Sequence, residues 1–146
     1  MDLNIFTTCI KNELMRYEGY SSKVYLDTMG LPTVGIGHMN KNMVVGSVYT
    51  PQQIDDLFAQ DVKNAVKIVD SLHLSLDDFR YRVLCNLCFN LGNKITQFSH
   101  FLAACIAKDW VSAAAALKNS AWFNQVGLHR GSETCYAIAN GKWQWE

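Results

Sequence analysis

The spacing of apolar residues predicts a mostly helical chain with one short segment of different character. In several stretches apolar side chains recur every three or four positions, which is the pattern of helices that bury one face. The predicted helices are Leu3 to Glu18, about 51 to 69, Leu76 to Leu91, Phe98 to Ala107, Trp110 to Leu117, a short piece around Trp122, and Gly131 to Ile138. The helix from Leu76 to Leu91 carries the densest apolar face and is expected to be the central buried one.

Residues at the ends of these stretches support the helix boundaries. Gly19 and Gly92 follow two apolar patterns directly, and glycine commonly ends a helix. Thr50-Pro51 combines a hydroxyl suited to an N-cap with a proline suited to the first helical position. Asp77 and Asp78 place negative charge in the first turn of the next helix, where the helix dipole favours it.

Between Val24 and Val48 the pattern changes to short β-branched and aromatic runs broken by glycines. Asp27 to Gly30 is typical of a turn, and Leu31 to Ile36 of a returning strand. We expect a small antiparallel sheet here. The predicted class is therefore α+β and mostly helical.

The length of 146 residues fits one domain around one core. Within it we expect a small sheet lobe over residues 19–50, a connecting helix over 51–69, and a helical lobe built from 1–18 and 70–146. A cleft between two lobes is a common place for a substrate site.

Composition and charge narrow the classes of function. With 49% apolar and 18% charged residues the chain is typical of a soluble globular protein, and no apolar run of about 20 residues could span a membrane. Charged residues interrupt the first twenty positions, so we expect no secretory signal peptide. The formal net charge of zero argues against a nucleic-acid partner, because contacts to phosphate dominate such binding.

The five cysteines are odd in number and lie mostly among apolar neighbours, which favours free, buried thiols. Cys85-x-x-Cys88 has the spacing of a redox or zinc motif, but no second Cys or His pair at ligand spacing accompanies it. We favour a position in a helical core for both.

Two carboxylates carry the candidate chemistry. Glu18 ends the first predicted helix and Asp27 begins the hairpin turn nine positions later, with Thr33 on the returning strand. Two carboxylates on separate elements can flank a glycosidic bond, one as acid and one as base or nucleophile. Each carboxylate also has an ordinary explanation. A glutamate at a helix end is commonly only solvated, and aspartate is common in turns because it binds its own backbone. His38, after Gly35-Ile36-Gly37, is more typical of a structural histidine than of a ligand or base.

Taken together, these segments closely resemble the phage-type lysozymes, glycoside hydrolase family 24. The resemblance covers nearly the full chain and is carried by residues 16–19, 24–28, 33–38, 50–62, 80–92 and 122–125, and by Arg130. It implies a lysozyme-like two-lobed fold and hydrolysis of the β-1,4 bond between N-acetylmuramic acid and N-acetylglucosamine in peptidoglycan, with inversion. It implies no cofactor and no metal.

The resemblance also implies roles for individual residues. Glu18 matches the general acid, Asp27 the second catalytic carboxylate and Thr33 the residue that positions water. Arg130 matches a positioning arginine that approaches the acid, and His38 with Asp61 matches a structural ion pair. Met39 and Phe89 match sugar contacts, although simple apolar packing explains both equally well. Phe101 and Ala116 occupy other contact positions of the family, which are polar in some members.

Two alternatives remain open from the sequence. A lytic transglycosylase needs a single glutamate, and Asp27 and Thr33 argue against it. A catalytically inactive glycan-binding relative would keep the fold without the reaction. The expected partner is the peptidoglycan strand, the expected state a monomer without membrane insertion, and the expected route synthesis in the cytoplasm followed by release to the periplasm through a holin or a secretion apparatus.

Overall fold

The computed structural model describes all residues from Met1 to Glu146. The chain forms two compact units, an N-terminal unit over Met1–Asn64 and a C-terminal unit over Ala65–Glu146. The boundary falls inside helix α2 (Pro51–Ser71). The structure contains seven α-helices, one 3-10 helix and a three-stranded antiparallel sheet, which confirms the predicted α+β class.

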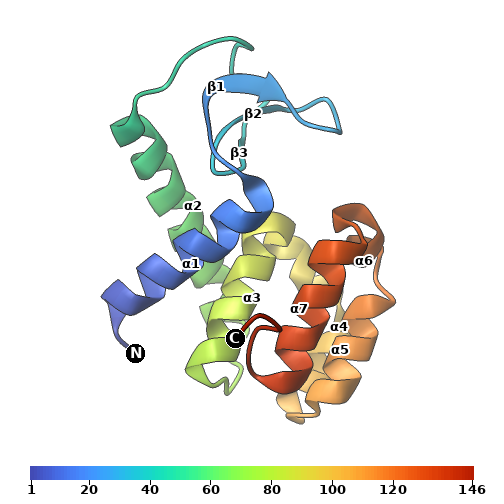
Figure 1. Ribbon diagram of the computed structural model, residues 1–146. Coiled ribbons are helices and arrows are strands. Elements are labelled where there is room, and N and C mark those ends of the chain that lie inside the picture. The colour runs from blue at the N-terminus through green and yellow to red at the C-terminus, as the bar shows by residue number, and fades with distance from the viewer. The chain divides into compact units, whose positions relative to one another are not determined.

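The N-terminal unit begins with helix α1 (Leu3–Glu18), shown in blue in Figure 1. The Asp2 side chain caps it by accepting from the backbone N–H groups of Asn4 and Ile5. At the other end Gly19 donates its N–H to the Met15 carbonyl with a φ of 70°, a conformation that glycine adopts readily. The helix therefore ends at Glu18, as its sequence predicts.

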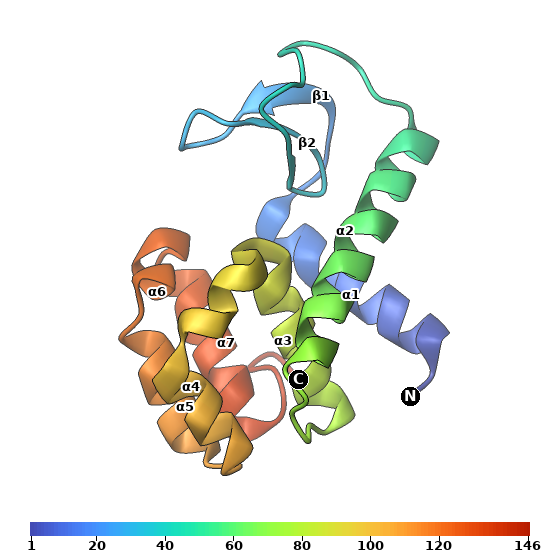
Figure 2. The same cartoon turned by 180° about the vertical axis from the view of Figure 1, so that it is seen from behind.

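The sheet follows α1 and consists of β1 (Ser21–Leu26), β2 (Pro32–Gly35) and β3 (His38–Met39), in that order. In register, Thr33 of β2 lies opposite Tyr25 of β1 and opposite Met39 of β3. The segment after β3 returns along the other edge of β1, where the Val24 N–H donates to the Ser47 carbonyl and the Tyr49 N–H to the Ser22 carbonyl. This returning segment is the long loop above β1 in Figures 1 and 2.

Helix α2 starts with a reciprocal capping box. The Gln53 N–H donates to Thr50 Oγ1 over 3.1 Å, while the Thr50 N–H donates to Gln53 Oε1 over 2.8 Å. The helix continues to Ser71, two residues beyond its predicted end. Its buried positions are Ile54, Phe58, Ala65 and Val69.

Helix α3 (Asp78–Leu91) is the most buried helix of the C-terminal unit, since every residue from 83 to 88 is buried. Five further elements follow it: η1 (Gly92–Gln97), α4 (Ser99–Ile106), α5 (Trp110–Lys118), α6 (Ala121–Val126) and α7 (Leu128–Asn140). Helix α7 packs against α3, α5 and α6 (Figures 1 and 2). The 3-10 helix was not predicted, because it has no apolar repeat of its own.

Helix α7 begins at Leu128, three residues before its predicted start at Gly131. Gly127, with a φ of 86°, provides the turn into the helix, and its carbonyl accepts from the Gly131 N–H. Gly131 is an interior position that serves packing, since a Cβ there would lie 2.6 Å from the Phe123 ring of α6. The glycine thus allows the close approach of α6 to α7 and does not mark a helix end.

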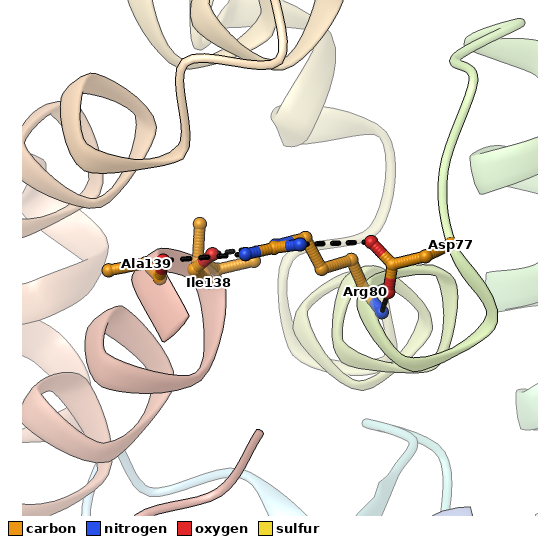
Figure 3. A network of polar contacts seen from close by, with 4 residues as sticks. All are labelled: Asp77, Arg80, Ile138 and Ala139. Atoms are coloured by element: carbon orange, nitrogen blue, oxygen red, sulfur yellow. Dashed lines mark hydrogen bonds and ion pairs between the residues drawn. The ribbon is translucent and has the colours of Figure 1, made fainter. Parts of the chain in front are cut away.

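Arg80 connects the start of α3 to the end of α7 (Figure 3). Its Nε donates to the Ile138 carbonyl over 2.7 Å and its Nη2 to the Ala139 carbonyl over 3.3 Å, while Nη1 lies 3.0 Å from Asp77 Oδ2. The guanidinium also lies over the Trp110 ring, 4.4 Å from its centroid. A cation at these carbonyls satisfies groups that a helix C-terminus leaves without partners.

All five thiols are free; Cys85, Cys88 and Cys105 are buried, and Cys9 and Cys135 are half-buried. The core position predicted for Cys85 and Cys88 is confirmed.

None of the helices combines the length and the apolar character that crossing a membrane would need.

Candidate active site

Glu18 is the last residue of α1, and its half-buried carboxylate lies against the turn that joins β2 to β3. The contact point is Gly37: a Cβ built there would lie 2.7 Å from Glu18 Oε2 and 2.9 Å from its Cδ. Gly37 has a φ of 65°, in the left-handed region. A glycine therefore serves both the backbone conformation and the approach of the carboxylate.

The same turn is attached to helix α2 at two points. Gly35, also at positive φ, faces Ile54, whose Cγ2 would lie 2.8 Å from a Cβ at position 35. His38 Nδ1 donates to Asp61 Oδ2 over 2.8 Å, with both side chains largely buried. The hydrogen bond to Asp61 raises the pKa of His38 above its ordinary value of 6.5, although desolvation opposes the shift. His38 and Asp61 thus form a hydrogen-bonded pair within the N-terminal unit, which is an ion pair when His38 is protonated.

Asp27 lies at the start of the hairpin turn, and backbone groups hold one side of its carboxylate. Oδ1 accepts from the Met29 N–H over 2.9 Å and from the Leu31 N–H over 2.8 Å. The backbone closes the same turn, since the Asp27 N–H donates to the Leu31 carbonyl and the Gly30 N–H to the Asp27 carbonyl. No hydrogen bond within the chain reaches Oδ2. The aspartate therefore has one oxygen that orients it and a second that remains available.

Thr33 is buried in β2, and its hydroxyl donates to the Leu31 carbonyl over 2.9 Å. That carbonyl also accepts from the Asp27 N–H, so a single peptide oxygen connects the aspartate and the threonine. Because the one hydroxyl hydrogen is used in this bond, Thr33 Oγ1 can only accept from a further group such as water.

Leu31 is a contributor that the sequence analysis missed. Its N–H binds the Asp27 carboxylate and its carbonyl binds both Asp27 and Thr33. The leucine side chain gives no indication of this, because only backbone atoms take part. The available signal was the Asp27-Thr28-Met29-Gly30 turn, since an aspartate that opens a turn commonly binds backbone N–H groups a few residues ahead.

The remaining predicted site residues are distributed over both units. Met39 in β3 is 46% exposed and lies opposite Thr33 in register, so it belongs to the same unit as Glu18 and Asp27. Phe89 is half-buried on α3. Arg130 is buried on α7, where Nη2 donates to Asn86 Oδ1 over 3.4 Å. Phe89 and Arg130 both belong to the C-terminal unit.

An open cavity of about 230 Å³ lies on the C-terminal unit, between η1, α4, α5 and α6. Phe101 and Ala116, the two other positions at which the sequence resemblance places contacts, both line it. His100, Ser99 and Ser120 contribute polar groups to the same lining.

The chain matches known proteins over most of its length. Residues 15–134 match the family described as Phage lysozyme. The "Endolysin" of Salmonella phage P22 is 32% identical over 108 residues, which covers 70% of this chain and 74% of that protein. "Probable T4-type lysozyme 1" of Dictyostelium discoideum is 28% identical over 145 residues, covering 80% of this chain and 85% of that protein. The "Endolysin" of Acyrthosiphon pisum secondary endosymbiont phage 1 is 28% identical over 103 residues, 70% of each chain.

Proposed function

The chain belongs to the phage lysozyme family, and from that premise we propose that it hydrolyses the β-1,4 bond between N-acetylmuramic acid and N-acetylglucosamine in peptidoglycan, with inversion. One observation carries the proposal. The segment that matches the family contains a carboxylate at a helix end, Glu18, and a hydrogen-bonded unit of Asp27, Leu31 and Thr33. Two carboxylates on separate elements are the groups that glycosidic hydrolysis of this kind requires.

Glu18 acts as the general acid in this proposal. It donates its proton to the glycosidic oxygen as the bond to the sugar breaks, so the leaving sugar departs as a neutral alcohol. The position at the last residue of α1, against the bare backbone of Gly37, restricts where the carboxyl group can lie. Holding a catalytic group in the reactive orientation can provide a large part of an enzyme's rate enhancement.

Asp27 and Thr33 together position the attacking water. A water that donates one hydrogen to Asp27 Oδ2 and the other to Thr33 Oγ1 directs a lone pair of its oxygen toward the sugar. Asp27 then takes the proton that the water loses as its oxygen bonds to the anomeric carbon. Thr33 serves only as an acceptor here, which agrees with its own hydrogen being donated to Leu31.

The other residues contribute to binding and to positioning. Met39, exposed beside Thr33, offers an apolar surface to a sugar, and we propose Phe89 as a second sugar contact. We propose Arg130 as a positioning residue for the general acid, and the His38–Asp61 pair as structural. The protein works as a monomer, without cofactor or metal, after release from the cytoplasm to the cell wall. The endolysins of two phages among its relatives support this route.

Substitution of the two carboxylates tests the proposal. Purified parent protein should clear a suspension of permeabilised Gram-negative cells, and Glu18→Gln should reduce the rate by about a hundred- to ten-thousandfold, because an amide cannot donate the required proton. Asp27→Asn should be similarly inactive yet folded, since the amide oxygen can keep both backbone N–H bonds of Oδ1. Far-UV circular dichroism and a denaturation midpoint should show that both variants are folded.

The products distinguish hydrolysis from its alternatives. Reducing muramic acid ends with inverted configuration at the anomeric carbon support the proposed roles of Asp27 and Thr33. Anhydro ends would identify a lytic transglycosylase, and retained configuration would make Asp27 a nucleophile. Full lytic activity of folded Glu18→Gln protein would contradict the assignment of the acid. A parent protein that binds glycan strands without cleaving them would be the inactive relative.

A further inference from the structure

Gly37 is the position where the sheet comes closest to the candidate general acid. A Cβ there would lie 2.7 Å from Glu18 Oε2 and 2.9 Å from both Cγ and Cδ of the same side chain. Distances below about 3 Å between a Cβ and other heavy atoms are strongly repulsive, so an added methyl group and the carboxylate cannot occupy these places together. Either the turn or the Glu18 side chain would have to move.

The turn is the less movable of the two. On one side of Gly37, Gly35 lies against Ile54, a fully buried side chain of α2. On the other side, His38 is bonded to Asp61, about two turns further along α2 than Ile54. The β2–β3 pairing adds Val34 opposite His38. The Glu18 side chain has several rotatable bonds beyond its Cβ, and it is the group that would yield to a new Cβ at position 37.

We propose that Gly37 is a positioning residue for the general acid: the absence of a side chain at this position leaves the space in which the Glu18 carboxylate lies. The proposal rests on the proposed function, in which Glu18 donates the proton. It gives a second reason for glycine at position 37. The first reason is the positive φ, which Gly35 and Gly46 also have. The consequence is that a small side chain at position 37 should impair catalysis far more than folding.

The test compares two glycines that both have a positive φ, 65° at Gly37 and 92° at Gly46. Gly37→Ala introduces a strained positive φ and displaces Glu18, whereas Gly46→Ala introduces a strained φ of 92° with nothing within 4 Å of the added Cβ. On soluble, uncross-linked glycan strands, Gly37→Ala should lower kcat by roughly ten- to a hundredfold with KM changed by less than about threefold. Gly46→Ala should keep kcat within about twofold of the parent, per folded molecule.

Gly37→Asn provides a second test that depends less on folding. Asparagine tolerates the left-handed region better than alanine does, yet it presents the same Cβ to Glu18. Its kcat should therefore fall as in Gly37→Ala even though its stability is closer to that of the parent. A kcat within twofold of the parent for folded Gly37→Asn protein overturns the proposal.

A cycle of stability measurements tests the contact without any reference to activity. In the parent background Gly37→Ala should lower the midpoint of urea denaturation more than Gly46→Ala does. In a Glu18→Ala background Gly37→Ala should lower the midpoint less than it does in the parent, whereas the effect of Gly46→Ala should be unchanged, because the group that collides with the new Cβ at position 37 is absent. An undiminished effect of Gly37→Ala in that background also overturns the proposal.

Failure of the proposed function would give a different result. If Glu18→Gln keeps full activity, Glu18 is not the acid, and the proposed function is wrong. The stability measurements then still test whether a side chain at position 37 collides with Glu18. If Glu18→Gln is inactive while Gly37→Ala and Gly37→Asn retain the parent's kcat, the acid is correctly assigned and only the positioning role of Gly37 is wrong.

Discussion

At the scale of single residues, the pair formed by His38 and Asp61 makes the stability of the N-terminal unit dependent on pH. Asp61 raises the pKa of His38 in the folded protein above 6.5 through the hydrogen bond of 2.8 Å. The folded state therefore holds this proton more tightly than the unfolded state does. The resulting stabilisation is fully present below about pH 6.5 and is lost as the pH rises through the higher pKa of the folded protein.

The parent should have a higher unfolding free energy than His38→Gln at about pH 5.5, and this difference should be smaller at about pH 9. The reason is that only the parent has a histidine that is protonated beside Asp61 at the lower pH. Urea denaturation of both proteins at the two pH values measures this difference. Using the difference between the proteins removes the contribution of other titrating groups. Asp61→Asn serves as the control and should abolish the same pH dependence. A difference that is constant with pH would show that the histidine stays neutral.

At the scale of elements, Arg80 determines how the end of α7 is held against the start of α3. Its planar guanidinium reaches two carbonyls, one carboxylate and one indole ring at once. A lysine at this position would carry the same charge on a single nitrogen and could not satisfy the two carbonyls in the same geometry. The geometry of the fork, rather than the charge alone, is therefore expected to stabilise this junction.

Arg80→Lys should lower the unfolding free energy by about 1.5–3 kcal/mol, the range for lost hydrogen bonds to a charged group. The effect should appear in urea denaturation, and lytic activity per folded molecule should stay unchanged because neither a step of the reaction nor a sugar contact is assigned to Arg80. Arg80→Met removes the charge as well and should cost more. Equal stability of the lysine variant and the parent would show that charge alone is sufficient.

At the scale of the whole molecule, the thiols report on the two units separately. Cys9 belongs to the N-terminal unit and the other four cysteines to the C-terminal unit. Burial raises the pKa of Cys88 and of Cys105 to about 12 and that of Cys135 to about 11, and it also raises the pKa of Cys85. These thiols carry almost no reactive thiolate near neutral pH while the C-terminal unit is folded.

In native protein at about pH 8 we expect a thiol reagent to modify Cys9 first, and Cys85, Cys88 and Cys105 only on unfolding. Mass spectrometry of peptides from briefly labelled protein at increasing urea concentration locates each modification. Labelling of the three buried thiols should follow the loss of secondary structure. Rapid modification of Cys88 in the absence of urea would contradict its burial, and iodoacetamide in fully denaturing urea provides the control in which all five react.

Much of the fold follows from local patterns, because helix boundaries depend on groups close in sequence. Gly19 and Gly92 end their helices where the apolar patterns end, and Thr50 with Gln53 forms its cap within one turn. Gly131 shows the limit of such arguments. A glycine in a helical pattern indicates a boundary, yet here it lies inside α7 because the Phe123 ring of another helix occupies the space beside it.

The sequence by itself determined the α+β class, several helix ends and the family, and it predicted the pair Glu18 and Asp27, since all of these depend on residue types at short spacing. Only the tertiary structure showed that the Leu31 peptide holds Asp27 and Thr33, and that Gly37 leaves room for the Glu18 carboxylate. The physical reason is the same in both cases. Backbone atoms form these contacts, and the side-chain pattern from which a sequence is interpreted carries no record of which backbone groups approach one another in space.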